Sequence, residues 1–163
     1  VRLTMIGDIE GLPKRSREAL QDAIRLTSHN DGLTLVLALN YGGRNEIVRA
    51  VKTIAERIER GELKSDAVTA DCIERSLDTA GMPDPDLLIR TSGEHRLSNF
   101  LLWQLAYTEL WITDVMWPDF GESEFLDAIE SFTGRERRFG MTSQQVTGIP
   151  QAIKRFITGG GAR

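Results

Sequence analysis

The feature that most constrains the fold is a short apolar run that ends in a pair of glycines. Residues Leu33–Leu39 are apolar except for Thr34, and residues 40–44 read Asn-Tyr-Gly-Gly-Arg. A strand covered on both faces reads this way, and such strands occur in parallel sheets flanked by helices. We therefore expect a central strand, buried on both faces. Alternation places these leucines on one face of it: Leu33, Leu35, Leu37 and Leu39.

Helical and strand-like segments alternate along the chain around this run. Apolar residues at helical spacing predict helices over residues 13–27, 45–60, 98–107 and 122–138, and a weaker one over 66–80. Short apolar runs predict strands at residues 3–6, 87–89 and 110–112. This order indicates an α/β fold, a parallel sheet flanked by helices, in one domain over residues 1–140. Residues 141–163 are expected to be a poorly ordered tail.

Composition narrows the classes of function. The 163 residues carry a net charge of −4 and the pI is near 5.3, whereas a general nucleic-acid binder would be basic, so no nucleic-acid partner is expected. The single cysteine, Cys72, forms neither an internal disulfide nor a multi-cysteine zinc site. The sequence contains no run of about 18 apolar residues, the length that a membrane-spanning helix needs. These features predict a cytoplasmic protein.

Cationic and hydroxyl side chains gather directly after the predicted strand at residues 87–89. They are Arg90, His95, Arg96 and Ser98. Ser98 is a good N-cap for the helix expected over residues 98–107, whose free N–H groups would favour a phosphate beside the two guanidinium groups. An ordinary solvated loop accounts for the same residues, so spacing alone leaves both interpretations open.

Two further features have a structural and a functional interpretation. The glycines of residues 40–44 favour a tight turn with positive φ, although they also allow a ligand to approach the backbone closely. Glu94 and Glu109 suit either an ion pair with a nearby arginine or a Mg²⁺ ion shared with a diphosphate. For Glu94 the ion pair is the preferred interpretation.

Several motifs together resemble the cis-prenyltransferases, the family of undecaprenyl diphosphate synthase and isoprenyl transferase. They are residues 6–8 (Ile-Gly-Asp), 40–44, 90–104, 106–110, 117–120 (Trp-Pro-Asp-Phe) and an Arg-x-Gly ending at 138–140. The likeness covers about residues 1–140. It implies the family's fold and its reaction. In that reaction isopentenyl diphosphate condenses with an allylic diphosphate, farnesyl or shorter, to give a polyprenyl diphosphate with cis double bonds.

The resemblance also implies roles for particular residues. Arg90, Arg96, Leu97 and Ser98 would bind isopentenyl diphosphate. Glu109 would bind Mg²⁺, with His95 assisting. Arg138 and Gly140 would reach across a homodimer to the partner's diphosphate. The basic residues 134–140 leave peripheral contact with a membrane surface open, beside the ordinary interpretation that they match a helix dipole.

One motif of the family is absent from these 163 residues. It is Asp-Gly-Asn, whose aspartate holds Mg²⁺ with the allylic diphosphate. We therefore interpret the chain as the C-terminal portion of a prenyltransferase, or a shortened member, that is inactive or impaired alone and whose catalytic residue is unassigned. The alternatives are a non-catalytic partner subunit and a generic phosphate-binding module. A scaffold has no need of Arg90, Arg96, Ser98 and Glu109, which favours the first interpretation.

The apolar run also has an interpretation that concerns product length. Leu33 lies seven residues before Asn40, roughly 23 Å along a strand at about 3.3 Å per residue. If the product grows along this strand, Leu33 and Leu35 line the cleft that limits its length. The alternative is that the whole run is sealed core.

Overall fold

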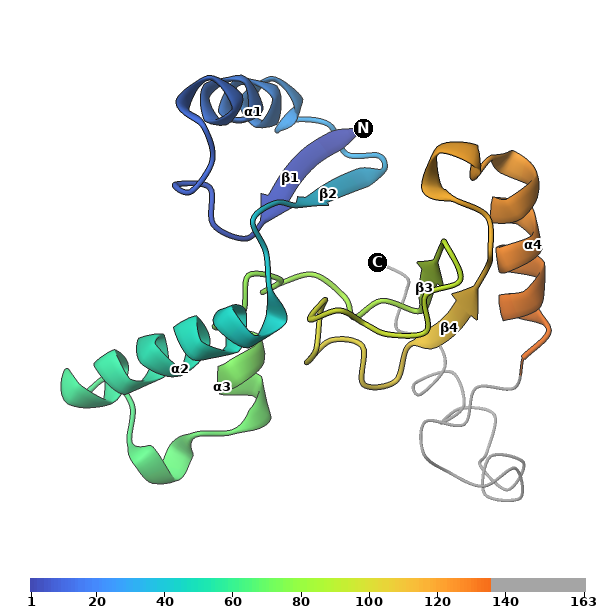
Figure 1. Cartoon of the computed structure of the whole chain (residues 1–163). Coiled ribbons are helices and arrows are strands. Elements are labelled where there is room, and N and C mark those ends of the chain that lie inside the picture. Colours follow the sequence, from blue (N-terminus) through green and yellow to red (C-terminus); the bar gives the residue numbers. More distant parts are fainter. Residues whose placement is uncertain (136–163) are drawn as a thin grey trace, which may run out of the picture. The chain divides into compact units, whose positions relative to one another are not determined.

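The computed structural model describes residues 1–135 and divides into two compact units (Figure 1). The N-terminal unit comprises Val1–Asp84 with Leu97–Trp103, and the C-terminal unit comprises Pro85–Arg96 with the residues from Gln104 onward. Each unit contains a two-stranded parallel sheet with helices beside it, which confirms the predicted fold class. Arg138, Gly140 and the tail at residues 141–163 lie outside the described residues.

The N-terminal unit is built on strands β1 (Arg2–Ile6) and β2 (Thr34–Ala38). They pair in parallel from Arg2↔Thr34 to Ile6↔Ala38. Helix α1 (Lys14–Thr27) packs on β1 (Figure 1). The hydroxyl of Thr27 accepts a 3.0 Å hydrogen bond from the Leu3 N–H, which fixes the end of α1 against β1.

Helix α2 (Gly43–Glu59) follows β2 and packs against the short helix α3 (Ala70–Glu74), which a 3₁₀ turn at Ser65–Ala67 precedes. The helical pattern over residues 66–80 therefore forms only two short pieces. One reason is that the Asp78 N–H donates to the Glu46 carboxylate (3.0 Å) and not to a helical carbonyl. The buried apolar side chains of this unit are Ile6, Ala50, Ile54, Leu77 and Leu101.

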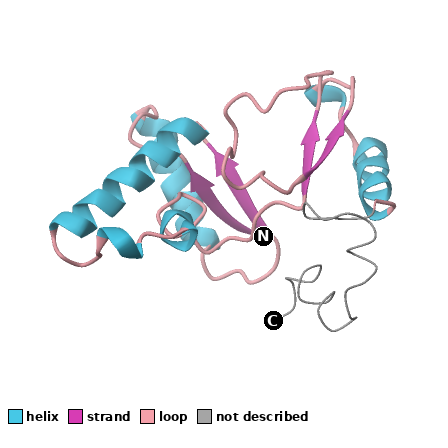
Figure 2. Cartoon of the chain, turned by 90° about the horizontal axis from the view of Figure 1, so that it is seen from below, coloured by secondary structure: helices cyan, strands magenta, loops and turns pink. Residues whose placement is uncertain are grey.

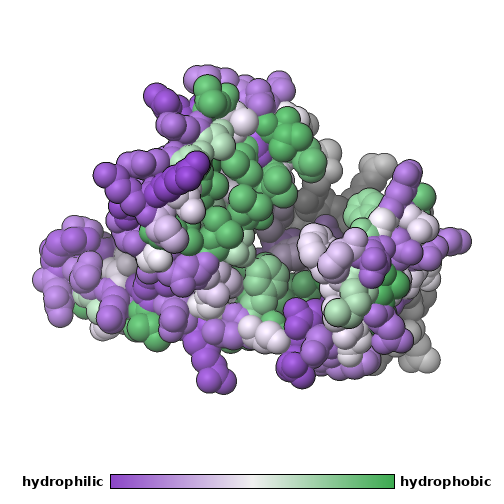
Figure 3. Space-filling model, turned by 45° about the horizontal axis from the view of Figure 1, so that its top comes forward, coloured by the Kyte–Doolittle hydropathy of each residue, from purple (hydrophilic) through white to green (hydrophobic). Residues whose placement is uncertain are grey.

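The prediction that the Leu33–Leu39 run is buried on both faces is wrong for the part of the chain described. Leu33 is 72% exposed and Leu35 is 48% exposed. Within the described residues, these two leucines are therefore not covered by another element. Figure 3 shows hydrophobic residues gathered on the surface of this unit.

The C-terminal unit is built on β3 (Leu87–Arg90) and β4 (Glu109–Ile112), which run in the same direction (Figure 2). A 3₁₀ turn at Trp117–Asp119 leads to helix α4 (Glu122–Thr133), which packs beside β4. The Glu124 carboxylate accepts a 2.9 Å hydrogen bond from the Gly121 N–H at the start of α4. The helix ends at Thr133, earlier than the predicted residue 138, with Gly134 as its C-cap.

The helix predicted over residues 98–107 does not form. This segment is a series of turns, and Ser98, Asn99 and Leu101 have φ of +50°, +64° and +44°. The carbonyl of Asn99 accepts a hydrogen bond from the Gly43 N–H of α2 instead of continuing a helix. Ser98 is therefore no N-cap, and the helix N-terminus predicted at this position does not form.

None of the helices in the described part of the chain combines the length and the apolar character needed to cross a membrane.

Candidate functional site

The ends of β1 and β2 meet at one edge of the N-terminal sheet, because the strands are parallel. Asn40 Nδ2 donates to the carboxylate of Asp8 at 3.3 Å, and the Asp8 N–H donates to the Asn40 carbonyl at 3.4 Å. The Asp8 carboxylate also accepts from the Glu10 N–H at 3.1 Å. Hydrogen bonds therefore connect the sequence motifs at residues 6–8 and 40–44 at one edge of the sheet.

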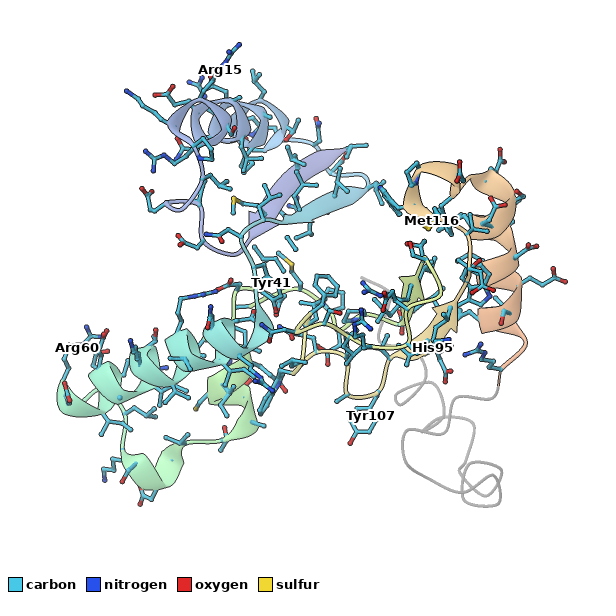
Figure 4. All side chains as sticks on the ribbon, in the orientation of Figure 1. Arg15, Tyr41, Arg60, His95, Tyr107 and Met116 are labelled. Carbon is cyan, nitrogen blue, oxygen red and sulfur yellow. The ribbon has the colours of Figure 1, made fainter. Side chains whose placement is uncertain are left out.

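A buried carboxylate, that of Glu46, is hydrogen-bonded to residues next to this edge of the sheet. Glu46 on α2 is 1% exposed, and its carboxylate accepts hydrogen bonds from the Tyr41 hydroxyl (2.6 Å) and the Asp78 N–H (3.0 Å). Asp78 in turn accepts from the Gly7 N–H (3.0 Å) and from Arg49 (2.6 Å). The ends of both strands are therefore tied to α2 and to the segment after α3. Figure 4 labels Tyr41 at this place.

The Tyr41 hydroxyl gives this network a pH dependence. Burial, and then the hydrogen bond to the Glu46 carboxylate, raise the pKa of Tyr41 above its ordinary value. In the unfolded chain a tyrosine ionises near pH 10. The folded state keeps the proton at higher pH, so the stabilisation is present below about pH 10 and is lost as the pH rises above it.

We predict that wild-type protein loses more unfolding free energy between about pH 9.5 and 11 than the variant Tyr41→Phe does. Urea unfolding at several pH values measures this. Tyr107→Phe is the matched control, because Tyr107 is 66% exposed (Figure 4). Identical pH profiles for wild type and Tyr41→Phe would contradict the network.

The glycines of residues 40–44 do not serve the predicted turn. Gly42 has φ −157° and Gly43 begins α2, so neither occupies the left-handed region. Both are buried, and a Cβ on either one would meet atoms of Asn99 or Leu102.

In the C-terminal unit, the loop after β3 is fastened to the segment after β4. The Thr113 N–H donates to the Arg90 carbonyl, the Ser92 N–H to the Val115 carbonyl and the Gly93 N–H to the Thr113 carbonyl, each at 2.9 Å. Ser92 and Gly93 both have positive φ, +66° and +63°. The main chain that leads to Glu94, His95 and Arg96 is therefore fixed by backbone hydrogen bonds.

Beyond this turn, Arg96 presents its charge to solvent. Its guanidinium group lies 2.8 Å from the Glu94 carboxylate, so the ion pair preferred for Glu94 is confirmed. The Arg96 side chain is 73% exposed, and His95 is exposed beside it (Figure 4). An exposed ion pair is worth roughly 0–1 kcal/mol, so Arg96 can exchange its partner for an anionic ligand at little cost.

Glu109, the candidate metal ligand, begins β4 and is engaged by a residue that the sequence interpretation missed. Its carboxylate accepts from Arg135 at 3.1 Å, and the same guanidinium donates to the Leu110 carbonyl (2.9 Å) and to the Ser131 hydroxyl (3.2 Å). Within residues 1–135 no cluster of three or more His, Cys, Asp or Glu side chains could hold a metal. A Mg²⁺ ion held by Glu109 would have to take its other oxygens from phosphate and water, as Mg²⁺ commonly does.

The candidate residues fall in both units. Arg90, His95, Arg96 and Glu109 belong to the C-terminal unit, and Leu33, Leu35, Leu97 and Ser98 to the N-terminal unit. Asn99 was also missed. The one sequence signal for it was its type, since asparagine tolerates positive φ better than most residues.

The fold and these motifs define an α/β protein with an exposed cationic loop after a parallel strand. Residues 1–140 match the Prenyltransf family model, described as undecaprenyl diphosphate synthase. An isoprenyl transferase of Geobacillus kaustophilus is 57% identical over 143 residues, covering 88% of this chain and 56% of the relative. The farnesyl-diphosphate-specific ditrans,polycis-undecaprenyl-diphosphate synthase of Coxiella burnetii is 48% identical over 146 residues, covering 90% and 62%.

A solved structure is also similar to this chain. The crystal structure of lavandulyl diphosphate synthase from Lavandula x intermedia, in complex with dimethylallyl diphosphate, matches with a TM-score of 0.83 at 44% identity, covering 85% of this chain and 60% of that one. The chain belongs to the undecaprenyl diphosphate synthase family of prenyltransferases. It spans 56% to 62% of the length of the two curated relatives named above.

Proposed function

We propose that the protein to which this chain belongs catalyses cis-prenyl transfer from an allylic diphosphate to isopentenyl diphosphate. The observation that carries the proposal is the family match over residues 1–140, which includes the fixed turn and the solvent-facing Arg96. In this proposal Arg90, Arg96, Leu97 and Ser98 bind isopentenyl diphosphate.

Two diphosphate groups need positive charge beside them. Isopentenyl diphosphate keeps its diphosphate through the reaction, whereas the C–O bond of the allylic substrate breaks, releasing a second diphosphate and leaving an allylic cation, and preorganised cationic donors stabilise these diphosphate charges. Guanidinium groups suit this task because they present paired N–H donors to phosphate oxygens. When bound, Mg²⁺ would neutralise part of the same charge, with Glu109 as a ligand and His95 assisting.

The remaining roles concern the whole protein. We propose that Arg138 and Gly140, outside the described residues, reach the partner's diphosphate in a homodimer. The printed name of the Coxiella burnetii relative specifies farnesyl diphosphate, which supports an allylic diphosphate of that size or shorter as the second substrate.

We predict that Arg96→Ala weakens isopentenyl diphosphate binding about tenfold or more. Loss of a charged hydrogen bond costs roughly 1.5–3 kcal/mol, and about 1.4 kcal/mol is a factor of ten in affinity. Isothermal titration calorimetry with Mg²⁺ present measures this.

Arg75→Ala is the matched control for this substitution. Arg75 is 76% exposed and pairs with Asp71 at 2.9 Å, so its removal also deletes an exposed ion pair. We expect unchanged binding in the control. Equal affinities for wild type and Arg96→Ala would remove Arg96 from the site.

We further propose that Leu33 and Leu35 line a cleft that limits product length, because both are exposed apolar residues, Leu35 on β2 and Leu33 directly before it. We predict that Leu33→Ala in a catalytically complete enzyme lengthens the products with little loss of rate. Since Leu33 is 72% exposed, the stability change should be about 0.5 kcal/mol or less, well below the roughly 2–5 kcal/mol of a buried leucine.

Chain-length analysis of the products, beside a melting curve, tests this role. Leu26→Ala is the control, because Leu26 is 77% exposed at the end of α1. An unchanged product distribution in Leu33→Ala would count against the cleft.

A further inference from the structure

The turns at residues 98–101 are held in an uncommon backbone conformation. Three residues other than glycine have positive φ within four positions, Ser98, Asn99 and Leu101. Such conformations are unfavourable for side-chain-bearing residues, and they persist only where surrounding contacts impose them. The Leu101 side chain is 9% exposed, so it anchors one end of the segment.

The other end is held by Asn99, which binds the start of α2. Its carbonyl accepts from the Gly43 N–H at 2.7 Å, and its side-chain Oδ1 accepts from the Arg44 N–H at 2.9 Å. The first N–H groups of a helix lack partners within the helix. Gly42, at the N-cap position, has no side chain to supply one, so Asn99 caps α2 from 55 residues away.

The two glycines make room for this contact. A Cβ on Gly42 would lie 2.7 Å from Asn99 Nδ2, and a Cβ on Gly43 would lie 3.2 Å from the Asn99 carbonyl oxygen and 3.0 Å from Leu102 Cγ. Because neither glycine has positive φ, what they provide here is space and not backbone freedom. The glycine pair in residues 40–44 thus allows residues 98–102 to pack closely against the start of α2.

We infer that Asn99 is a positioning residue for isopentenyl diphosphate binding, acting through its neighbour Ser98. Asn99 fixes the strained main chain at Ser98 against the start of α2, so the Ser98 hydroxyl and N–H keep one orientation. Gly42 contributes to the same positioning, because its lack of a side chain leaves room for the Asn99 amide. The inference rests on the proposed function, in which Ser98 binds the substrate. Supporting groups of this kind hold a binding residue within the narrow limits that ligand contacts require.

A double-mutant cycle of Gly42→Ala and Asn99→Ala tests the coupling, with isopentenyl diphosphate as the calorimetric probe. Each single variant is expected to weaken binding about tenfold, which corresponds to about 1.4 kcal/mol. In the Asn99→Ala background the added Cβ at position 42 meets no amide, and extended backbone accepts alanine. Gly42→Ala is therefore expected to weaken binding no further there, which is strong non-additivity.

Thr27→Val is the control for general destabilisation, because it also removes a side-chain oxygen from a backbone N–H, that of Leu3, far along the chain. All affinities are measured well below the lowest melting temperature. We expect Thr27→Val to bind as wild type even if it melts as low as Asn99→Ala.

Three results would overturn the inference. They are wild-type affinity in Asn99→Ala, additive losses in the cycle, and an equal loss in Thr27→Val. If the wild-type chain itself binds no isopentenyl diphosphate, the proposed function fails and the inference fails with it. Faster amide exchange at Gly43 and Arg44 in Asn99→Ala reports the cap independently of any substrate, and unchanged exchange there would contradict it.

Discussion

The 163-residue chain is expected to show little or no prenyl transfer, and the same chain joined to a segment that carries Asp-Gly-Asn is expected to be active. The difference should be at least about a thousandfold. Charge stabilisation by a bound metal ion is worth several kcal/mol, and each 1.36 kcal/mol is about tenfold in rate.

Incorporation of isopentenyl diphosphate into a lipid-extractable product, with farnesyl diphosphate as the primer, measures this difference. The matched control carries Ala-Gly-Asn in place of Asp-Gly-Asn in the added segment, so that length and fold are unchanged. It should be as inactive as the isolated chain. Full turnover by the isolated chain would refute this division of the catalytic groups.

The second large effect concerns stability. Glu46→Ala is expected to destabilise the N-terminal unit by about 2–4 kcal/mol, because it leaves the Tyr41 hydroxyl and the Asp78 N–H without their buried acceptor. The replacement also leaves a cavity at a site that is 1% exposed. Urea unfolding, followed by circular dichroism, measures the change.

Glu56→Ala is the control for this substitution. Glu56 is an exposed residue of the same helix, and alanine is the better helix former, so its stability should stay within about 0.5 kcal/mol of wild type. Equal stabilities of Glu46→Ala and Glu56→Ala would show that the buried network contributes nothing.

Local patterns in the sequence predict most elements of this fold. Apolar periodicity places α1 and α2 within a few residues of their observed bounds, because one face of α2 is buried and one face of α1 is half-buried. The strands at residues 87–90 and 109–112 are found for the same kind of reason, since short apolar runs mark them. The Glu94–Arg96 ion pair follows from spacing and opposite charge.

What fails depends on contacts between residues far apart in the chain. The segment from Ser98 has helical spacing, yet Asn99 bonds to Gly43 and Arg44 and the helix does not form. Likewise Asp78 bonds to Gly7 and Glu46, which cuts short the helix predicted there. Burial of Leu33 could not be inferred from its neighbours in sequence, because it depends on what packs against β2.

The motif resemblance identifies candidate residues but not the groups that hold them. The resemblance implied no role for Arg135, which donates to Glu109, or for Asn99, which caps α2. Their partners are 26 and 55 residues away in the chain, and no local pattern reports such pairs.

A crystal structure of the chain with isopentenyl diphosphate and Mg²⁺ tests the central claim most directly. The account predicts the diphosphate in contact with the guanidinium groups of Arg90 and Arg96 and with Ser98, with the Glu94–Arg96 ion pair opened or shared. A diphosphate bound elsewhere, with the side chains of Arg90 and Arg96 pointing to opposite faces of the protein, would contradict it.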